Sequence, residues 1–352
     1  MSAYNVTSQN KGSALNRVTL DDVAKEAGVS RATVSRVVND YPHVSDKVRD
    51  HVQACIDRLG YNPNVIARSL ASQRTGNIGL VFPNSIHNFF TDPYYPRLTE
   101  GIAHACNENE YTLSLFIFHT AELEKKLIPR LTRGGIVDGI IVQATGIDDD
   151  VLSKIHEGNV PVLVAGRPFN LPEANYIDVD NVSGAYNAAA HLIRAGRECI
   201  GMISGALNTS AGLDRLEGYQ QALRERGFPV EDRLIAQGDF SEDSGYQAAR
   251  QLLENDQLDA IFAASDTMAV GALKAVKDLE LKVPEDIAVV GFDDLPPARS
   301  ADPPLTTIRQ PIRRFGVKAV DVLIDIIHNG GEPPRRVILG TDLVVRESCG
   351  SI

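Results

Sequence analysis

The spacing of hydrophobic positions along the chain changes near residue 76. Upstream, apolar residues recur every three or four positions between short polar turns, which is typical of amphipathic helices. Downstream, short apolar runs alternate with helical stretches, and this alternation predicts parallel sheets covered by helices. We interpret as strands the runs 77–82, 113–118, 138–144, 160–166, 199–204, 258–265 and 286–292. The helical stretches include 95–110, 183–196, 213–227, 242–255 and 266–280.

The alternating part of the chain is too long for one sheet, so we expect two lobes with a cleft between them. Parallel sheets bind ligands at the carboxyl ends of their strands, and the cleft is therefore the expected ligand site. The 352 residues, 43% of them hydrophobic and 23% charged, suit a globular protein of two or three domains. We predict an α/β fold with these parts: a disordered leader over 1–16, an all-α head over 17–62, a hinge helix and linker over 63–75, and a body over 76–352.

Capping residues predict where the helices of the head begin. Thr19 can cap a first helix over 20–26, because Asp22 stands three residues later at the capping-box position. Ser45 can cap a third helix, which Gly60 would end.

Between these two helices, a turn at Gly28 precedes a second helix over 31–38 that Ser30 can cap. Helix, glycine-containing turn and helix is the arrangement that places a second helix in the major groove of DNA. Arg31 and Arg36 of that helix can each offer two donors to a guanine. The small core between the helices is predicted to contain Val23, Ala27, Val34 and Val37.

Charge is divided unevenly between the head and the body. The chain carries a net charge of −11, yet residues 1–75 have 10 Lys and Arg against 7 Asp and Glu, and the remainder has 25 against 39. A mildly basic head on an acidic body fits a head that meets phosphate, although chance explains the asymmetry equally well. No apolar run approaches the ~18 residues of a membrane helix, and the N-terminus lacks an apolar signal core. We expect a cytoplasmic protein with no membrane partner.

The head and several motifs of the body resemble the lactose-repressor/galactose-repressor family of bacterial regulators. The head carries VTLDDVAKEAGVSRATVSRVVND followed by YNPNVIARSLAS, and the similarity covers roughly 17–349. The body motifs that carry it are IGLVFP, DPYYPRLTEGI, VDGIIV, VPVLVAGRP, RLEGYQQAL, SDTMAVGAL, VVGFDDLP, PPLTTIRQP and LVVRES. The resemblance implies a two-lobed body like type I periplasmic binding proteins. The N-lobe would comprise about 76–178 and 309–339, and the C-lobe about 179–308 and 340–352.

Membership of this family would also imply a homodimeric repressor that binds a pseudo-palindromic operator in double-stranded DNA. The positions that match base readers are Arg31, Ala32 and Arg36. Those that match contacts to the DNA backbone are Thr19, Ser30, Thr33, Ser35, Asn39 and His43. Paired hinge helices would enter the minor groove with Ala67 and Leu70, where an apolar wedge kinks DNA.

Polar groups at the ends of predicted strands point to a small-molecule effector. The resemblance places Arg215 and Asp293 most firmly in that site, through the motifs RLEGY and GFDD. The other candidates are Tyr94, Arg167, Phe240, Ser265 and Ile312. Carboxylates and guanidinium groups around a cleft suit the hydroxyls of a sugar, and the absence of a basic cluster disfavours a phosphorylated one. Taken singly, each of these residues has an equally good structural role as a cap, an ion pair or a core side chain.

Catalytic and metal-binding motifs are absent from the sequence. There is no G-x-S-x-G, H-E-x-x-H, P-loop or strand-following G-x-G-x-x-G, and the histidines and four cysteines lack metal-ligand spacing. We therefore expect no enzyme, no cofactor and no metal. Three alternatives stay open: a regulator with a purine-type co-repressor, a sugar-binding protein without a regulatory role, and an enzyme of doubly wound fold. The identity of the effector and the sign of its action are not readable from the sequence.

Overall fold

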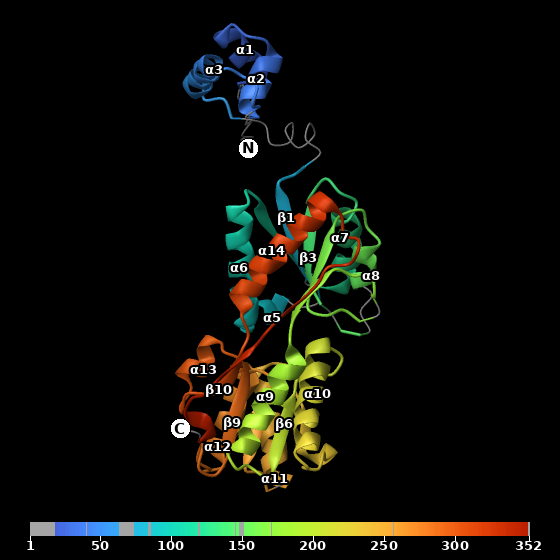
Figure 1. Cartoon of the computed structure of the whole chain (residues 1–352), viewed down its shortest axis with the longest axis vertical. Coiled ribbons are helices and arrows are strands. Elements are labelled where there is room, and N and C mark those ends of the chain that lie inside the picture. The colour runs from blue at the N-terminus through green and yellow to red at the C-terminus, as the bar shows by residue number, and fades with distance from the viewer. Residues whose placement is uncertain are drawn as a thin grey trace, which may run out of the picture. The chain divides into compact units, whose positions relative to one another are not determined.

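The computed structural model describes residues 18–39, 41–62, 74–83, 86–118, 120–144, 146–147, 151–169, 171–255 and 257–350. The chain forms two compact units, one up to Arg74 and the other from Thr75 onwards. The described part of the first unit is helical, and the second contains two mainly parallel sheets flanked by helices (Figure 1). The predicted fold class is therefore confirmed. The expected leader over 1–16 and the hinge positions Ala67 and Leu70 lie outside the described residues.

The head contains three helices, α1 (Leu20–Ala27), α2 (Arg31–Val38) and α3 (Asp46–Leu59). The predicted capping box is present: the Thr19 hydroxyl accepts from the Asp22 N–H at 3.3 Å, and the Asp22 carboxylate accepts from the Thr19 N–H at 2.8 Å. Gly28 ends α1 with φ 63°, a left-handed conformation that glycine adopts without strain. The predicted core is confirmed, since Val23, Ala27, Val34 and Val37 are all buried. Ser45 is the N-cap residue of α3 as predicted, and its side chain makes no hydrogen bond to that helix.

The N-lobe is built on a six-stranded parallel sheet of order β11-β5-β4-β3-β1-β2. Its strands are β1 (Asn77–Phe82), β2 (Thr112–Ile117), β3 (Gly139–Gln143), β4 (Val162–Ala165), β5 (Tyr176–Val179) and β11 (Arg336–Leu339). One face packs on α6 (Tyr94–Glu108) and α14 (Ile312–Asn329), which lie side by side although they are far apart in the sequence (Figure 1). The other face packs on α7 (Ala121–Leu131) and α8 (Val151–His156). A short helix, α5 (Ile86–Thr91), precedes α6.

The C-lobe has a sheet of order β12-β10-β9-β8-β6-β7, in which only the pairing of β12 with β10 is antiparallel. Its strands are β6 (Ile200–Ser204), β7 (Ile235–Gln237), β8 (Ala260–Ala263), β9 (Ala288–Asp293), β10 (Thr306–Arg309) and β12 (Asp342–Val344). Its helices are α9 (Asn181–Arg194), α10 (Ser210–Glu225), α11 (Glu242–Asn255), α12 (Asp266–Asp278) and α13 (Pro296–Ser300). Two single 3₁₀ turns cover Asp232–Leu234 and Glu347–Cys349.

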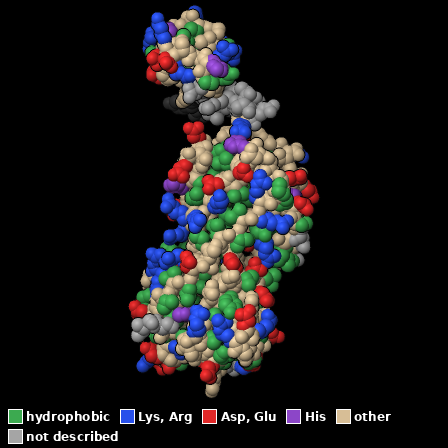
Figure 2. Space-filling model, viewed as in Figure 1, with side chains coloured by type: hydrophobic (Ala, Val, Ile, Leu, Met, Phe, Trp, Pro, Cys, Tyr) green, Lys and Arg blue, Asp and Glu red, His purple; other side chains and the backbone are tan. Residues whose placement is uncertain are grey.

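The chain passes between the two sheets three times, after β5, after β10 and after β11. Each passage leaves the carboxyl end of a strand, so side chains at these strand ends stand where the two lobes meet. On the face drawn in Figure 2, acidic and basic side chains of the body are interspersed with apolar ones. Within the residues described above, every helix is too short or too polar to span a bilayer.

Candidate DNA-binding and ligand-binding sites

The second helix of the head presents a polar face to solvent. Arg31, Ala32, Arg36 and Asn39 are exposed, whereas Val34 and Val37 on the opposite side are buried. Ala32, Arg36 and Asn39 recur at four- and three-residue intervals, which places them on one stripe of α2. The Arg31 guanidinium is 69% exposed and lies 3.5 Å from the Asp21 carboxylate, so it is held loosely at the surface. Two of the predicted base readers, Ala32 and Arg36, thus share one accessible stripe, and the third, Arg31, is exposed at the start of the helix.

The predicted backbone contacts have local hydrogen bonds of their own. The Ser30 hydroxyl accepts from the Thr33 N–H at 3.1 Å and also bonds to the Thr33 hydroxyl at 2.9 Å. The Asn39 amide donates to the Ser35 carbonyl at 2.8 Å. These bonds fix the two ends of α2. The contact of these side chains with DNA phosphate stays a prediction. His43 is exposed, with its ring edge-on to Tyr41 at 5.8 Å between centroids.

Arg215 and Asp293, from motifs far apart in the sequence, meet in the C-lobe. Arg215 lies in the second turn of α10, since that helix begins at Ser210 rather than at the predicted residue 213. Its Nη1 stands 3.5 Å from the Asp293 carboxylate, and its Nε donates to the Asn181 side-chain oxygen at 2.9 Å. The guanidinium also lies 3.8 Å from the ring centroid of Phe292. Both charged side chains are nearly buried, at 6% and 7% exposure.

Two carboxylates of the N-lobe, the buried Asp178 and the partly buried Asp92, lie within electrostatic reach of this pair, and the sequence analysis missed both. Asp178, at the carboxyl end of β5, accepts from the Val179 N–H at 2.8 Å and from the Asn181 amide at 3.2 Å. Asp92 precedes α6 and accepts from the Tyr94 N–H at 2.9 Å. Burial raises the pKa of both carboxyl groups, and the positive charge of Arg215 acts in the opposite direction on each. That influence indicates that Arg215 lies within electrostatic reach of both N-lobe groups.

Tyr94 completes the N-lobe side of this cluster. Burial raises the pKa of its hydroxyl above the ordinary value, and the nearby negative charges of Asp178 and Asp293 raise it further. The phenol therefore stays protonated and can donate a hydrogen bond. Together, Asp92, Tyr94 and Asp178 from one lobe and Arg215 and Asp293 from the other form what we call the interlobe cluster.

The Asp293 carboxyl of the interlobe cluster has a pKa near neutral pH. Burial raises the pKa of this carboxyl to about 7, even though Arg215 favours the ionised form. The negative charge of Asp92 raises the pKa further, and the Gln310 amide, which donates to the carboxylate, lowers it. The backbone of Asp293 has φ 122°, which is unusual for a residue with a side chain and marks a constrained position.

The remaining effector candidates lie in four different environments. The Phe240 ring, at a residue with φ 72°, lies 5.9 Å from the Arg215 guanidinium and so borders the cluster. Ser265 is 4% exposed and caps α12, where its hydroxyl accepts from the Met268 N–H at 3.2 Å. Ile312 is 3% exposed and packs in the N-lobe core. Arg167 follows β4 and binds Asp214 of the C-lobe.

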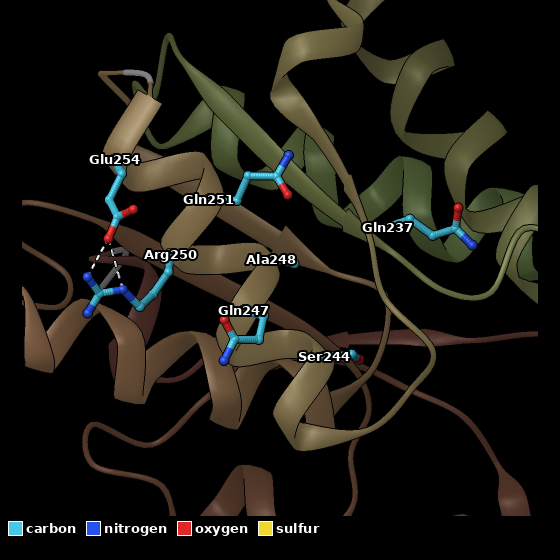
Figure 3. Close-up of a pocket in the computed structure, with 7 residues that line it drawn as sticks. All are labelled: Gln237, Ser244, Gln247, Ala248, Arg250, Gln251 and Glu254. Carbon is cyan, nitrogen blue, oxygen red and sulfur yellow. Dashed lines mark hydrogen bonds and ion pairs between the residues drawn. The ribbon is translucent and has the colours of Figure 1, made fainter.

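A separate surface pocket of about 500 Å³ lies on the C-lobe, lined by α11 and by Gln237 at the end of β7 (Figure 3). It contains none of the predicted effector residues, and its one arginine, Arg250, is bound to Glu254. We therefore base the ligand site on the interlobe cluster. Among the described residues no group of three or more His, Cys, Asp or Glu is arranged to hold a metal ion.

A head with a helix-turn-helix, joined to a two-lobed body whose charged groups meet between the lobes, defines a DNA-binding regulator with a ligand-binding domain. Comparison with known families agrees with this class. Residues 19–64 match the family described as bacterial regulatory proteins of the lacI family, and residues 189–349 match the periplasmic binding protein-like domain.

Full-length relatives and solved structures extend the match to nearly the whole chain. The HTH-type transcriptional regulator CelR of Thermobifida fusca is 38% identical over 94% of this chain and 98% of its own length. The repressor PurR of Proteus mirabilis is 37% identical, over 94% and 96%.

Solved structures that resemble the chain include the following two. A CelR–cellobiose complex has a TM-score of 0.75 at 37% identity and covers 94% of this chain and 100% of its own. The lac repressor dimer bound to operator and the anti-inducer ONPF has a TM-score of 0.81 at 30% identity, over 95% and 99%. The chain belongs to the lacI family of bacterial regulatory proteins and is a DNA-binding transcriptional regulator.

Proposed function

We propose that the chain is a cytoplasmic, homodimeric repressor of carbohydrate-utilisation genes whose effector is a neutral sugar bound at the interlobe cluster. The observation that carries the proposal is the meeting of Arg215 and Asp293 with Asp92, Tyr94 and Asp178 of the opposite lobe. The similarity to a regulator solved with cellobiose supports a glucose-containing disaccharide as the first candidate.

The charges of the cluster favour a neutral, hydroxyl-rich ligand. One guanidinium, that of Arg215, faces three carboxyl groups, and it is already paired with Asp293. Sugar hydroxyls can donate to carboxylates and accept from the arginine and the tyrosine at the same time. A phosphate or carboxylate on the ligand would meet like charges in a desolvated site, which costs binding free energy.

Operator recognition would combine base reading, backbone contacts and a hinge. We assign base reading to Arg31, Ala32 and Arg36, all of which are exposed on the head. The roles of Ala67 and Leu70 in the minor groove rest on the family resemblance. A two-fold dimer would present two heads to a pseudo-palindromic site.

The dimer itself is supported by apolar surface on the N-lobe. Leu115 on the edge strand β2 is 45% exposed, and Leu123 and Leu127 on α7 are 44% and 38% exposed. Exposed leucines on an edge strand and on the helix that follows it in the sequence favour contact with a second copy.

Control would follow from the position of the ligand between two lobes. A ligand that contacts both lobes favours one lobe arrangement, and it shifts the equilibrium only by its differential affinity for the two. In a dimer, a change of lobe angle would alter the spacing of the two hinge segments. We infer that the chain acts by binding alone, as a regulator rather than an enzyme.

A purine-type co-repressor is the second candidate effector. The PurR repressors among the relatives favour it, and so do the aromatic rings of Tyr94, Phe240 and Phe292 beside the cluster. This candidate predicts that the ligand strengthens operator binding, whereas the repressor of a sugar-utilisation operon should release DNA when the sugar binds.

A thermal-shift screen with cellobiose, maltose, cellobiose 6-phosphate, hypoxanthine and guanine separates the candidates. The correct ligand at 100 times its Kd stabilises the protein by roughly 2.7 kcal/mol. We expect stabilisation by a neutral disaccharide and none by its phosphate. If only a purine base stabilises the protein, the sugar is excluded as the effector and the purine-type co-repressor is supported.

A further inference from the structure

A side chain of the N-lobe reaches the C-lobe beside the interlobe cluster. Arg167 follows β4, and its backbone N–H donates to the Asp178 carboxylate at 2.8 Å. Its guanidinium donates to the Asp214 carboxylate on α10 at 2.5 Å. The two charged side chains are 39% and 20% exposed, so the pair lies at the margin between solvent and the buried cluster.

A backbone hydrogen bond joins the lobes next to this ion pair. The Ile147 N–H, in the loop after β3, donates to the Asn208 carbonyl just before α10 at 2.8 Å. Strands β3 and β4 are neighbours in the N-lobe sheet, and Asn208 and Asp214 flank the start of α10. The two contacts therefore connect the loops after two neighbouring strands of the N-lobe to the start of one helix of the C-lobe. Neither involves the three passages where the chain crosses between the lobes.

Arg167 also separates two carboxylates. Besides burial, the negative charge of Asp214 raises the pKa of Asp178, which indicates that the two groups are close across the lobes. The guanidinium is bound to Asp214, and its residue is anchored on Asp178. Without the arginine the two carboxylates would repel each other across the cleft. Without Asp214 the arginine would still have Asp178 beside it.

We propose that Asp214 determines effector affinity by holding Arg167 as a latch that keeps the two lobes closed. The proposal rests on the proposed function only in placing the effector between the lobes. Asp214 acts through Arg167 and is therefore a positioning residue. Closed lobes slow the escape of a ligand held between them, so the latch should be felt mainly in ligand dissociation.

The latch is tested first without any ligand, by hydrogen exchange of the Ile147 amide in the full-length protein. This amide is a reporter because its partner, Asn208, belongs to the other lobe. A half-exposed ion pair is worth a few-fold in an equilibrium constant, so Asp214→Asn should accelerate exchange about three- to fivefold. Arg167→Gln should accelerate it more, because it leaves Asp178 and Asp214 facing each other.

Two further variants make the exchange experiment specific. Asp214→Glu keeps the charge and should restore slow exchange. Glu217→Gln is the matched control, since Glu217 lies on the same helix and pairs with Arg224 within the C-lobe. Unchanged Ile147 exchange in Asp214→Asn, or equal acceleration in Glu217→Gln, would overturn the latch.

Calorimetric titration with cellobiose then tests the effect on affinity. We expect the Kd to rise about fivefold in Asp214→Asn and to return towards the parent value in Asp214→Glu. An unchanged Kd in a variant whose exchange is accelerated would refute Asp214 as a determinant of affinity. If cellobiose fails to bind the parent protein, the proposed sugar is wrong, and the exchange experiment still decides whether the latch exists.

Discussion

Asp293 is the residue whose chemistry depends most on its surroundings. It ends β9 in a constrained conformation, accepts from Gln310 and faces Arg215 at 3.5 Å. Burial outweighs the arginine and raises the pKa of the carboxyl to about 7. The side chain therefore changes between a hydrogen-bond donor and a pure acceptor near neutral pH.

This titration predicts a pH-dependent effector affinity. A sugar hydroxyl that donates to the Asp293 carboxylate requires the ionised form, so a proton must leave before the ligand binds. With a pKa of about 7, the ionised fraction, and hence the affinity, should fall roughly tenfold between pH 8 and pH 6. Calorimetry across this range measures the effect. Asp293→Asn should bind more weakly with no such slope, and an equal slope in that variant would assign the titration to another group.

The same shift has a consequence for stability without ligand. A carboxyl whose folded-state pKa is raised stabilises the fold below its unfolded pKa, near 4, and this contribution is lost as the pH rises through the folded pKa. The parent should therefore lose stability relative to Asp293→Asn between pH 4 and pH 8. Paired urea denaturation curves check this, and a constant difference between parent and variant would contradict it.

In the head, Arg36 carries the prediction for base recognition. It is exposed on α2, and no ion pair is recorded for it among the described residues. Arg36→Ala should cost about 1–3 kcal/mol at the operator and relax specificity at one position in each half-site. The Kd values for an operator duplex and for a random duplex, measured at one salt concentration, give the specificity ratio. An unchanged ratio would place Arg36 on phosphate instead.

Residue types and motifs were enough to find Arg215 and Asp293, because each stands in a recognisable motif at a strand end or in a helix. Asp178 and Asp214 could not be found in this way. Asp178 is the next-to-last residue of a four-residue strand that the alternation did not reveal, and Asp214 is bound to an arginine of the other lobe. Ser265 and Ile312 were also candidates, and the structure gives each a structural role: Ser265 caps α12, and Ile312 packs in the N-lobe core. Their contact with an effector stays a prediction.

At the scale of elements, capping residues predicted the starts of all three helices of the head, but the side-chain bond expected of a cap is present in α1 and α2 and absent in α3. The difference is physical: Thr19 and Ser30 accept from backbone N–H groups, whereas Ser45 has a suitable backbone conformation and no such bond. A sequence pattern identifies a residue that can cap, and the rotamer it adopts is decided by its surroundings.

This contrast gives a matched pair of variants. Thr19→Ala removes a two-sided capping box and should destabilise α1 by about 1 kcal/mol, because an N–H at the helix start loses its acceptor. Ser45→Ala should leave α3 nearly unchanged. Hydrogen exchange of the amides in α1 and α3 of the full-length protein measures both effects. Equal losses in the two variants would mean that the caps contribute nothing specific.

The sequence pattern located the strands that form continuous apolar runs, including the four-residue strands β4 and β8, and missed five others. Strands β5, β7, β10, β11 and β12 have three or four residues and each contains a polar one, so they form no continuous apolar run and are too short to establish alternation. The missed helix α14 did carry a signal, since Phe315, Ala319, Leu323 and Ile326 recur at helical spacing and are buried. Its partner, α6, lies far away in the sequence, so their packing follows only from the order of the sheet.

At the scale of the whole molecule, the apolar edge of the N-lobe predicts the dimer. Leu115→Asp should weaken dimerisation, because the charge would have to lose its water at the interface. Ile338→Asp is the control: it is 52% exposed on β11, at the opposite edge of the same sheet. Sedimentation velocity over a concentration series distinguishes the two. Equal dimer dissociation constants in the two variants would exclude the β2 edge as the dimer interface.

The central claim is that a sugar in the interlobe cluster controls operator binding. The most direct measurement is the titration of a selected operator duplex with the protein, with and without saturating cellobiose, for the parent and Asp293→Asn. Couplings between sites are typically about 1–3 kcal/mol, so the operator Kd of the parent should rise about 5- to 150-fold with the sugar. The variant should bind operator as the parent does without sugar and should respond much less to it. A parent whose operator affinity is the same with and without a sugar that it demonstrably binds would contradict the account.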